Sequence, residues 1–76
     1  MTNAETIARL EWRIASHRTR AEVNHQTLTR LAEDYPLKTP EAIQEWTEAT
    51  RSKCYCQGEI IKDTERLARI RAKVAK

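Results

Sequence analysis

The sequence of 76 residues contains no phenylalanine, one glycine and two prolines. So few turn-forming residues exclude the many-turned all-β folds, which need turn signals at regular intervals. Aromatic residues make up 5% of the chain, and ten of its apolar residues are alanine, so bulky core material is scarce. Chains of this length bury only about 60% of their unfolded surface. We therefore do not expect a core that encloses a catalytic pocket, and we predict that the chain is not an enzyme.

Long apolar runs are missing as well. No segment approaches the roughly 18 apolar residues of a membrane span. Charged residues interrupt positions 1–13, where a secretory signal would need a continuous apolar stretch. The two cysteines, Cys54 and Cys56, are too few for a disulfide framework. We therefore expect a reduced, cytoplasmic chain without membrane contact. If a phage encodes the protein, this compartment is the cytoplasm of the host cell.

The sequence carries two helix starts. Thr2 and Glu5 have the spacing of a capping box, in which a hydroxyl and a carboxylate bind free amides of the first turn. Thr39 and Pro40 mark the second start, because threonine is a good N-cap and proline suits the first helical position. Pro36 disfavours helical geometry at the residue before it, so the first helix should end there. The predicted elements of this single domain (1–76) are a helix over about 3–34, a turn over 35–39 and a helix over about 40–75.

Both predicted helices carry apolar residues at alternating steps of three and four, the spacing of a coiled-coil seam. His17 and Asn24 interrupt the first seam and are expected to set its register, as buried polar groups do in coiled coils. The expected fold is all-α, a long antiparallel two-helix hairpin that resembles a coiled coil. A lone hairpin exposes one side of each core residue, so we expect a homodimer that forms a four-helix bundle. The predicted oligomer seam consists of Ile7, Leu10, Ile14, His17, Asn24, Leu28, Leu31, Ile60, Leu67 and Ile70.

The register of the hairpin follows from the position of the turn, near residue 37. Antiparallel pairing about this point predicts that Leu10 faces Leu67. The same pairing predicts that Ile14 faces Ile60 and Ile61. Apolar contacts are therefore expected at both ends of the hairpin, whereas polar residues occupy its middle.

Gly58 is the weak point of the second predicted helix. Glycine inside a helix costs about 1 kcal/mol relative to alanine. However, no cluster of proline, asparagine and aspartate accompanies it, and the apolar pattern resumes in phase. The sequence therefore favours one long helix, bent at most at Gly58, over two shorter helices.

Groups that could carry chemistry are few. Cys54 and Cys56 lie about 200° apart around a helix, so they cannot share a metal ion or a disulfide, and we expect small, partly buried side chains. His17 and His25 lie more than two turns apart, and no suitably spaced nucleophile or glycine-rich loop accompanies them. We therefore predict no catalytic residue, no metal site, no cofactor and no small-molecule substrate.

Charge is distributed unevenly. Residues 1–35 are neutral, residues 36–59 have a net charge of −1, and residues 60–76 have a net charge of +4. The hairpin would then have a basic open end and an acidic turn end. Helix-dipole complementation and solubility explain such a pattern, and the functional alternative is a footprint for nucleic acid or an acidic protein surface. The C-terminal cations are Lys62, Arg66, Arg69, Arg71, Lys73 and Lys76.

The leading functional hypothesis is a non-enzymatic protein–protein interaction module, a small helical adaptor or inhibitor that docks on a larger protein. Trp12 lies off the predicted seam, and exposed tryptophans are enriched among interface anchors. Tyr55 is expected on the outer face, opposite the seam, whereas Tyr35 and Leu37 are expected to plug the turn. Small proteins of this kind are common among phage and mobile-element products that act on a host machine. The expected contact residues are Trp12, Trp46, Tyr55, Arg66, Arg69, Arg71 and Lys73.

Two alternatives stay open. A nucleic-acid-associated protein would place the basic end of the second helix on phosphates, although no aromatic residue lies within that basic set. A structural protein would form one bundle component of a larger assembly. The two differ in behaviour, because nucleic-acid binding depends on salt, whereas a structural component enters its assembly stoichiometrically.

Overall fold

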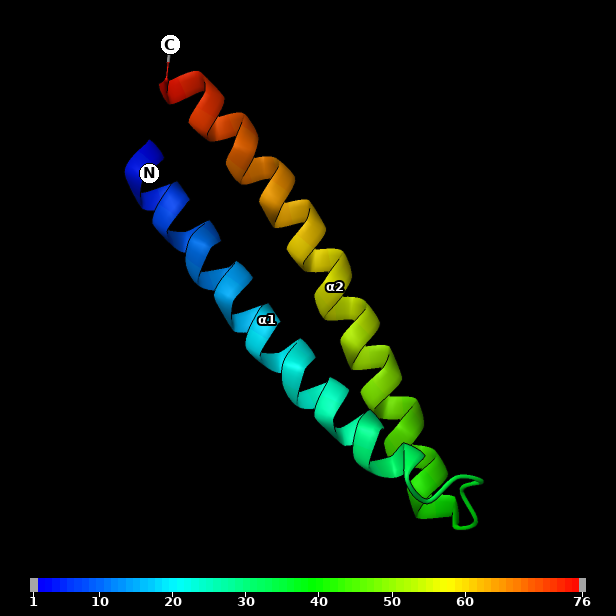
Figure 1. Ribbon diagram of the computed structural model, residues 1–76. Helices are drawn as coiled ribbons and strands as arrows, with labels where there is room; N and C mark the ends of the chain where they lie inside the picture. The colour runs from blue at the N-terminus through cyan, green and yellow to red at the C-terminus, as the bar shows by residue number, and fades with distance from the viewer. Residues whose placement is uncertain (1, 76) are drawn as a thin grey trace.

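The computed structural model describes residues 2–75, which form two long helices, α1 (Asn3–Ala32) and α2 (Pro40–Val74). The helices run antiparallel, so both ends of the chain lie at the open end of the hairpin and the turn lies at the other (Figure 1). The molecule is a rod with extents of 56 × 16 × 15 Å. The predicted all-α helical hairpin is confirmed.

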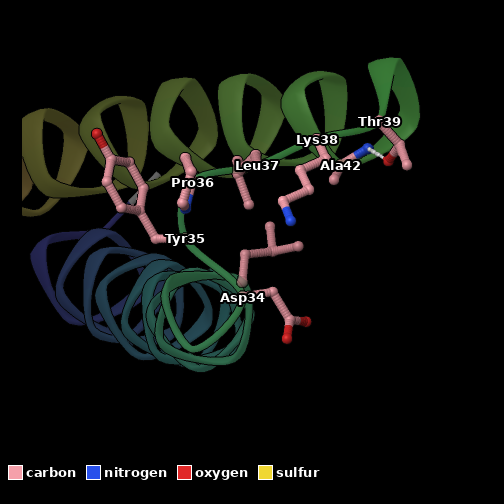
Figure 2. Close-up of a pocket in the computed structure, with 8 residues that line it drawn as sticks. Asp34, Tyr35, Pro36, Leu37, Lys38, Thr39 and Ala42 are labelled. Carbon is pink, nitrogen blue, oxygen red and sulfur yellow. Dashed lines mark hydrogen bonds between the residues drawn. The ribbon is translucent and has the colours of Figure 1, made fainter.

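Both helices begin at the predicted capping residues. The Glu5 amide donates to Thr2 Oγ1 at 3.1 Å, and the Thr2 amide donates to the Glu5 carboxylate at 3.3 Å, which completes the capping box. At the start of α2, the Ala42 amide donates to Thr39 Oγ1 at 3.1 Å (Figure 2). Pro40 occupies the first turn of this helix. These bonds satisfy amides that have no partner within the helix itself.

The first helix ends at Ala32, two residues earlier than the sequence predicts. The amides of Asp34 and Tyr35 donate to carbonyls three residues back, rather than four, at 3.1 and 3.3 Å. Pro36 disfavours helical geometry at the residue before it, so the chain tightens and leaves the helix here. The connecting segment therefore takes in residues 33–39.

The second helix runs through Gly58 without interruption, as predicted, and ends at Val74. A methyl group at the position of the missing Gly58 side chain would have no neighbour within 4 Å. Among the described residues, no neighbouring group therefore comes so close to the backbone at Gly58 that only glycine would fit.

An apolar core holds the helices together in the half of the rod near the open end. Leu10 is 1% exposed and Leu67 is 6% exposed, and their contact confirms the predicted register. Ile61 is 60% exposed, so the prediction that it faces Ile14 is wrong. The core consists of Leu10, Ile14 and Leu67, with Ile7, Ile60 and Ile70 packed against them.

The half of the rod near the turn is held by smaller and more polar contacts. Leu31 and Ala49 are buried there, at 4% and 6% exposure. Closer to the middle, the Asn24 amide donates to Ser52 Oγ at 2.8 Å across the two helices. All ten residues of the predicted oligomer seam are buried or half-buried in the single chain. A role for them in an oligomer stays a prediction.

Candidate functional site

A polar cluster lies between the helices, on the side of the middle that faces the open end. Arg13 and His17 stand one turn apart on α1, and Glu59 and Asp63 stand one turn apart on α2. Side chains four positions apart share a helix face. Each helix therefore contributes two polar side chains to the same place, where the apolar seam is interrupted.

Arg13 bridges the two carboxylates of this cluster. Its Nη2 atom lies 3.3 Å from Glu59 Oε2, and its Nε atom lies 3.3 Å from Asp63 Oδ2. Lys62 reaches Glu59 from the exposed side, with 3.6 Å between Nζ and Oε1. The Arg13 side chain is 38% exposed, so water screens part of its attraction for the acids.

Asp63 is the unusual member of the cluster. Its side chain is 7% exposed, and Oδ2 accepts no hydrogen bond from any residue that the structure describes. The Arg13 contact is thus an ion pair without the geometry of a hydrogen bond. Leaving a buried acceptor unsatisfied costs about 1–3 kcal/mol. The cluster therefore holds a buried carboxylate oxygen that has an ion pair with Arg13 but no hydrogen bond from the described residues.

His17 completes the cluster beside Tyr55. The two rings meet edge to face, with 6.0 Å between their centroids and 79° between their planes. The expectation that Tyr55 lies opposite the seam is therefore wrong, because its ring lies at the edge of the interhelical contact. Nitrogen or oxygen atoms of His17, Glu59 and Asp63 lie within 4.8 Å of one another. The sequence interpretation missed this group, although the spacing of Glu59 and Asp63 indicates a shared face.

A shallow groove with exposed apolar side chains lies next to the polar cluster. Trp12 is 71% exposed, Tyr55 is 59% exposed and Val23 is 55% exposed. Trp12 and Tyr55 line the same groove, and Ser16 and Arg20 continue it along α1 to Val23. We call this surface the Trp12 face, defined by Trp12, Ser16, Arg20, Val23 and Tyr55.

Cations extend from the Trp12 face toward the open end. They recur on α2 after Tyr55 at the steps of three and four that keep side chains on one helix face. Glu59 is the acidic member of this row, and it already pairs with Arg13 and Lys62. We call this row the basic stripe, which consists of Lys62, Arg66, Arg69 and Lys73.

The predicted contact residues do not form one continuous surface. Trp12, Tyr55 and three of the predicted cations belong to the Trp12 face and the basic stripe. Arg71 lies outside the stripe and pairs with Glu11, with 2.6 Å between Nη2 and Oε1. Trp46, which is 37% exposed, lies nine positions before Tyr55, about 14 Å along the helix axis. Lys76 lies outside the described residues.

The turn forms a second groove, separate from the Trp12 face. Trp46 lines it together with Tyr35, Pro36 and Leu37. Leu37 is half-buried, as expected of a plug, but Tyr35 is 80% exposed (Figure 2). The prediction that Tyr35 helps to plug the turn is therefore wrong, because the early end of α1 leaves its ring outside the interhelical contact.

The two cysteines differ in environment. Cys56 is 0% exposed between the helices, whereas Cys54 is exposed, and both are free thiols. Their separation follows from helix geometry, which points residues two positions apart in nearly opposite directions.

No protein-family model, curated protein or solved structure matches this chain. Over the described residues, neither helix contains a stretch long and apolar enough to cross a membrane. Similarity thus assigns no family and no activity to the hairpin. Its surface chemistry supports the functional proposal below.

Proposed function

We propose that the hairpin is a non-enzymatic protein–protein interaction module that docks its Trp12 face on a larger protein. The observation that carries this proposal is the exposure of Trp12, Tyr55 and Val23 along two adjoining shallow grooves, which share Ser16 and Arg20. Large apolar side chains that gather on the surface of a small protein mark interaction sites, and tryptophan and tyrosine are the commonest anchors. The hairpin thus leaves its tryptophans exposed although bulky core material is scarce.

Charge indicates the chemistry of the partner. Arg13 and Arg20 border the groove on α1, and the basic stripe extends it on α2. Opposite charges across an interface speed association and select the partner. We therefore infer an acidic partner surface around an apolar depression that accepts the Trp12 side chain.

The shape of the molecule suits an adaptor or an inhibitor. A rod 56 Å long can cover a long strip of a partner while adding little bulk. Such a module acts by occupying a surface, either to bring two proteins together or to keep another ligand away. A second copy of the chain is the competing occupant of the Trp12 face, and it would produce the homodimer that the sequence predicts.

Nucleic acid is the second candidate ligand, and one observation favours it. No aromatic residue lies among the C-terminal cations in the sequence. In the structure, however, Tyr55 precedes the basic stripe on the same face of α2 and lines a groove together with Trp12. Aromatic rings beside a basic row are the arrangement on which single-stranded nucleic acids stack. Under this hypothesis Arg66 and Arg69 contact phosphates.

A pull-down from lysate, divided into nuclease-treated and untreated halves, separates the candidates. We expect a partner protein that is retained in both halves, lost with Trp12→Ala and lost with the double variant Arg66→Glu, Arg69→Glu. Ile61→Ala is the matched control. Ile61 is an exposed apolar residue of α2, at 60% exposure, but it points about 120° away from Tyr55 around that helix. Capture that Trp12→Ala leaves intact would overturn the proposed docking face.

The same variants identify the other outcomes. Capture that disappears with nuclease and falls steeply with salt would assign the basic stripe to nucleic acid. Light scattering that finds a dimer, converted to monomer by Trp12→Ala, would assign the Trp12 face to a second copy. Incorporation at fixed stoichiometry into a large particle would indicate a structural component instead.

A further inference from the structure

We infer that His17, Glu59 and Asp63 form a binding site for a divalent transition-metal ion of the zinc type. The three residues come from both helices, and one ligand atom of each lies within 4.8 Å of the others. The site is distinct from the proposed docking surface, although His17 also borders the groove beside Trp12 and Tyr55.

The ligand set selects the class of metal. Zinc binds both imidazole nitrogen and carboxylate oxygen, and its catalytic sites have three protein ligands and an open fourth position. One imidazole and two carboxylates match these ligand types and this number. Calcium and magnesium prefer ligand sets made of oxygen alone. Copper(I) prefers thiolate and thioether sulfur, and the three residues offer neither. Imidazole and carboxylate together therefore favour a divalent transition-metal ion over calcium, magnesium and copper(I).

The buried carboxylate of Asp63 points to a ligand independently of this clustering. The residue is 5% exposed, and its Oδ2 atom accepts no hydrogen bond from the described part of the chain. That oxygen lies 3.3 Å from Nε of Arg13, whose guanidinium also pairs with Glu59. A metal ion would coordinate this oxygen directly, whereas the protein groups around it donate no hydrogen bond to it.

The required rearrangement is small. Metal–ligand bonds of about 2.0–2.2 Å in a tetrahedral site place ligand atoms about 3.4 Å apart. The three residues must therefore close by an ångström or somewhat more from their present separation. His17 and Glu59 are half-buried rather than packed on all sides, so changes of rotamer can bring their ligand atoms together.

Arg13 is the group that competes with the metal. Its guanidinium lies against both carboxylates. It supplies one positive charge, whereas two are needed to neutralise the two carboxylates. Because its side chain is 38% exposed, it can swing out to water when a dication binds. Arg13 already borders the groove beside Trp12 together with Arg20. Its release from the two carboxylates would leave an unpaired positive charge there, which links metal occupancy to the charge of that surface.

The test uses the untagged chain with zinc and, as a spectroscopic probe, cobalt(II). We expect one zinc ion per chain in calorimetry, a higher melting temperature with zinc, and a cobalt absorption spectrum of nitrogen and oxygen ligands without a thiolate charge-transfer band. Asp63→Asn and His17→Gln should each weaken zinc binding by about 10-fold or more, at least the loss that follows when only a partner of a ligand is changed. The first exchanges a charged carboxylate for a neutral amide, and the second removes the imidazole. His25→Gln and Cys54→Ser are the matched controls and should leave the affinity unchanged.

Arg13→Gln gives the sharpest result. It removes the competing cation but no ligand, so zinc should bind more tightly than to the native chain. A merely structural ion-pair cluster predicts no zinc binding to either protein.

Three results would overturn the site. The first is the absence of a zinc-dependent shift in melting temperature. The second is zinc binding that His17→Gln leaves intact. This variant is informative even if Asp63→Asn fails to fold, because His17 is only half-buried and its replacement disturbs the core less. The third is binding that His25→Gln or Cys54→Ser abolishes, which would assign the metal to the surface histidine or the exposed thiol.

Discussion

The open half of the hairpin buries large aliphatic side chains, whereas the half near the turn relies on an alanine, a leucine and polar contacts. Leu10, Ile14 and Leu67 form the core in this open half. Near the turn, Ala49 packs at 6% exposure, and Arg30 and Glu45 pair across the helices. The difference follows from connectivity, because the turn already holds one end of the helices together. At the open end no covalent link joins the helices, so the burial of apolar side chains must keep them from separating.

Between these two regions lies the polar cluster of Arg13, His17, Glu59 and Asp63. His17 and Asp63 occupy seam positions at which aliphatic residues would continue the core of the open half, and Arg13 and Glu59 flank them. Burying charge without full hydrogen bonding contributes little to stability and often reduces it. The cluster therefore contributes less to the stability of the fold than the aliphatic core of the open half does.

The largest effect should come from the core of the open half. We expect Leu10→Ala to lower the free energy of unfolding by about 2–4 kcal/mol, because it empties a fully buried site among aliphatic neighbours. Leu31→Ala should cost less, since the covalent turn keeps the helices together beside it. Urea denaturation followed by circular dichroism measures both.

Ile61→Ala serves as the control for this comparison. Its side chain is 60% exposed, so the change should stay within about 0.5 kcal/mol. Equal losses for Leu10→Ala and Leu31→Ala would contradict the proposed difference between the two halves.

A smaller effect of opposite sign should come from the polar cluster. We expect Asp63→Leu to raise the free energy of unfolding by about 1–2 kcal/mol, because it removes an unsatisfied buried oxygen and extends the core of Ile60 and Leu67. Arg13 keeps Glu59 as a partner and is exposed enough to be hydrated. Thermal and urea unfolding check the sign, and a loss of stability would show that the ion pair with Arg13 is a net stabilising contact.

The smallest effect should come from Gly58. Gly58→Ala should stabilise the protein by at most about 1 kcal/mol, because alanine favours the helix and restricts the unfolded chain. The added methyl group meets no atom within 4 Å, so no clash offsets the gain. A loss of stability in the same unfolding experiment would indicate that α2 needs the flexibility of glycine at this point.

Much of the fold is predictable because its signals are local. The capping box of Thr2 and Glu5 and the Thr39–Pro40 start depend on residues within one turn of each other, and both helices begin there. The position of the turn sets the register, which correctly pairs Leu10 with Leu67. The error at Ile61 concerns a side chain at the margin of the seam, where a small rotation of the helix decides between burial and exposure. The error at Tyr35 follows from the early end of α1, which leaves this residue in the connecting segment.

The candidate sites are less predictable, because each combines residues from both helices. Periodicity correctly placed Trp12 off the seam, but it did not indicate that Tyr55 would lie against His17 and share a groove with Trp12. Likewise, Glu59 and Asp63 share a helix face from their spacing alone, whereas their approach to His17 is a property of the packed hairpin. Sequence spacing relates side chains on one helix and leaves open how two helices are rotated about their axes.

Local patterns in this chain thus suffice to specify two helices, their starting residues, their antiparallel pairing and the uneven charge along them. The packing of the helices adds the rest, which is the burial of Asp63, the bridging position of Arg13 and the joining of Trp12, Tyr55 and the basic stripe on one side of the rod. The physical reason is one of range. Caps and helical periodicity act over a few neighbouring residues, whereas the environment of a side chain depends on residues brought alongside it from the other helix.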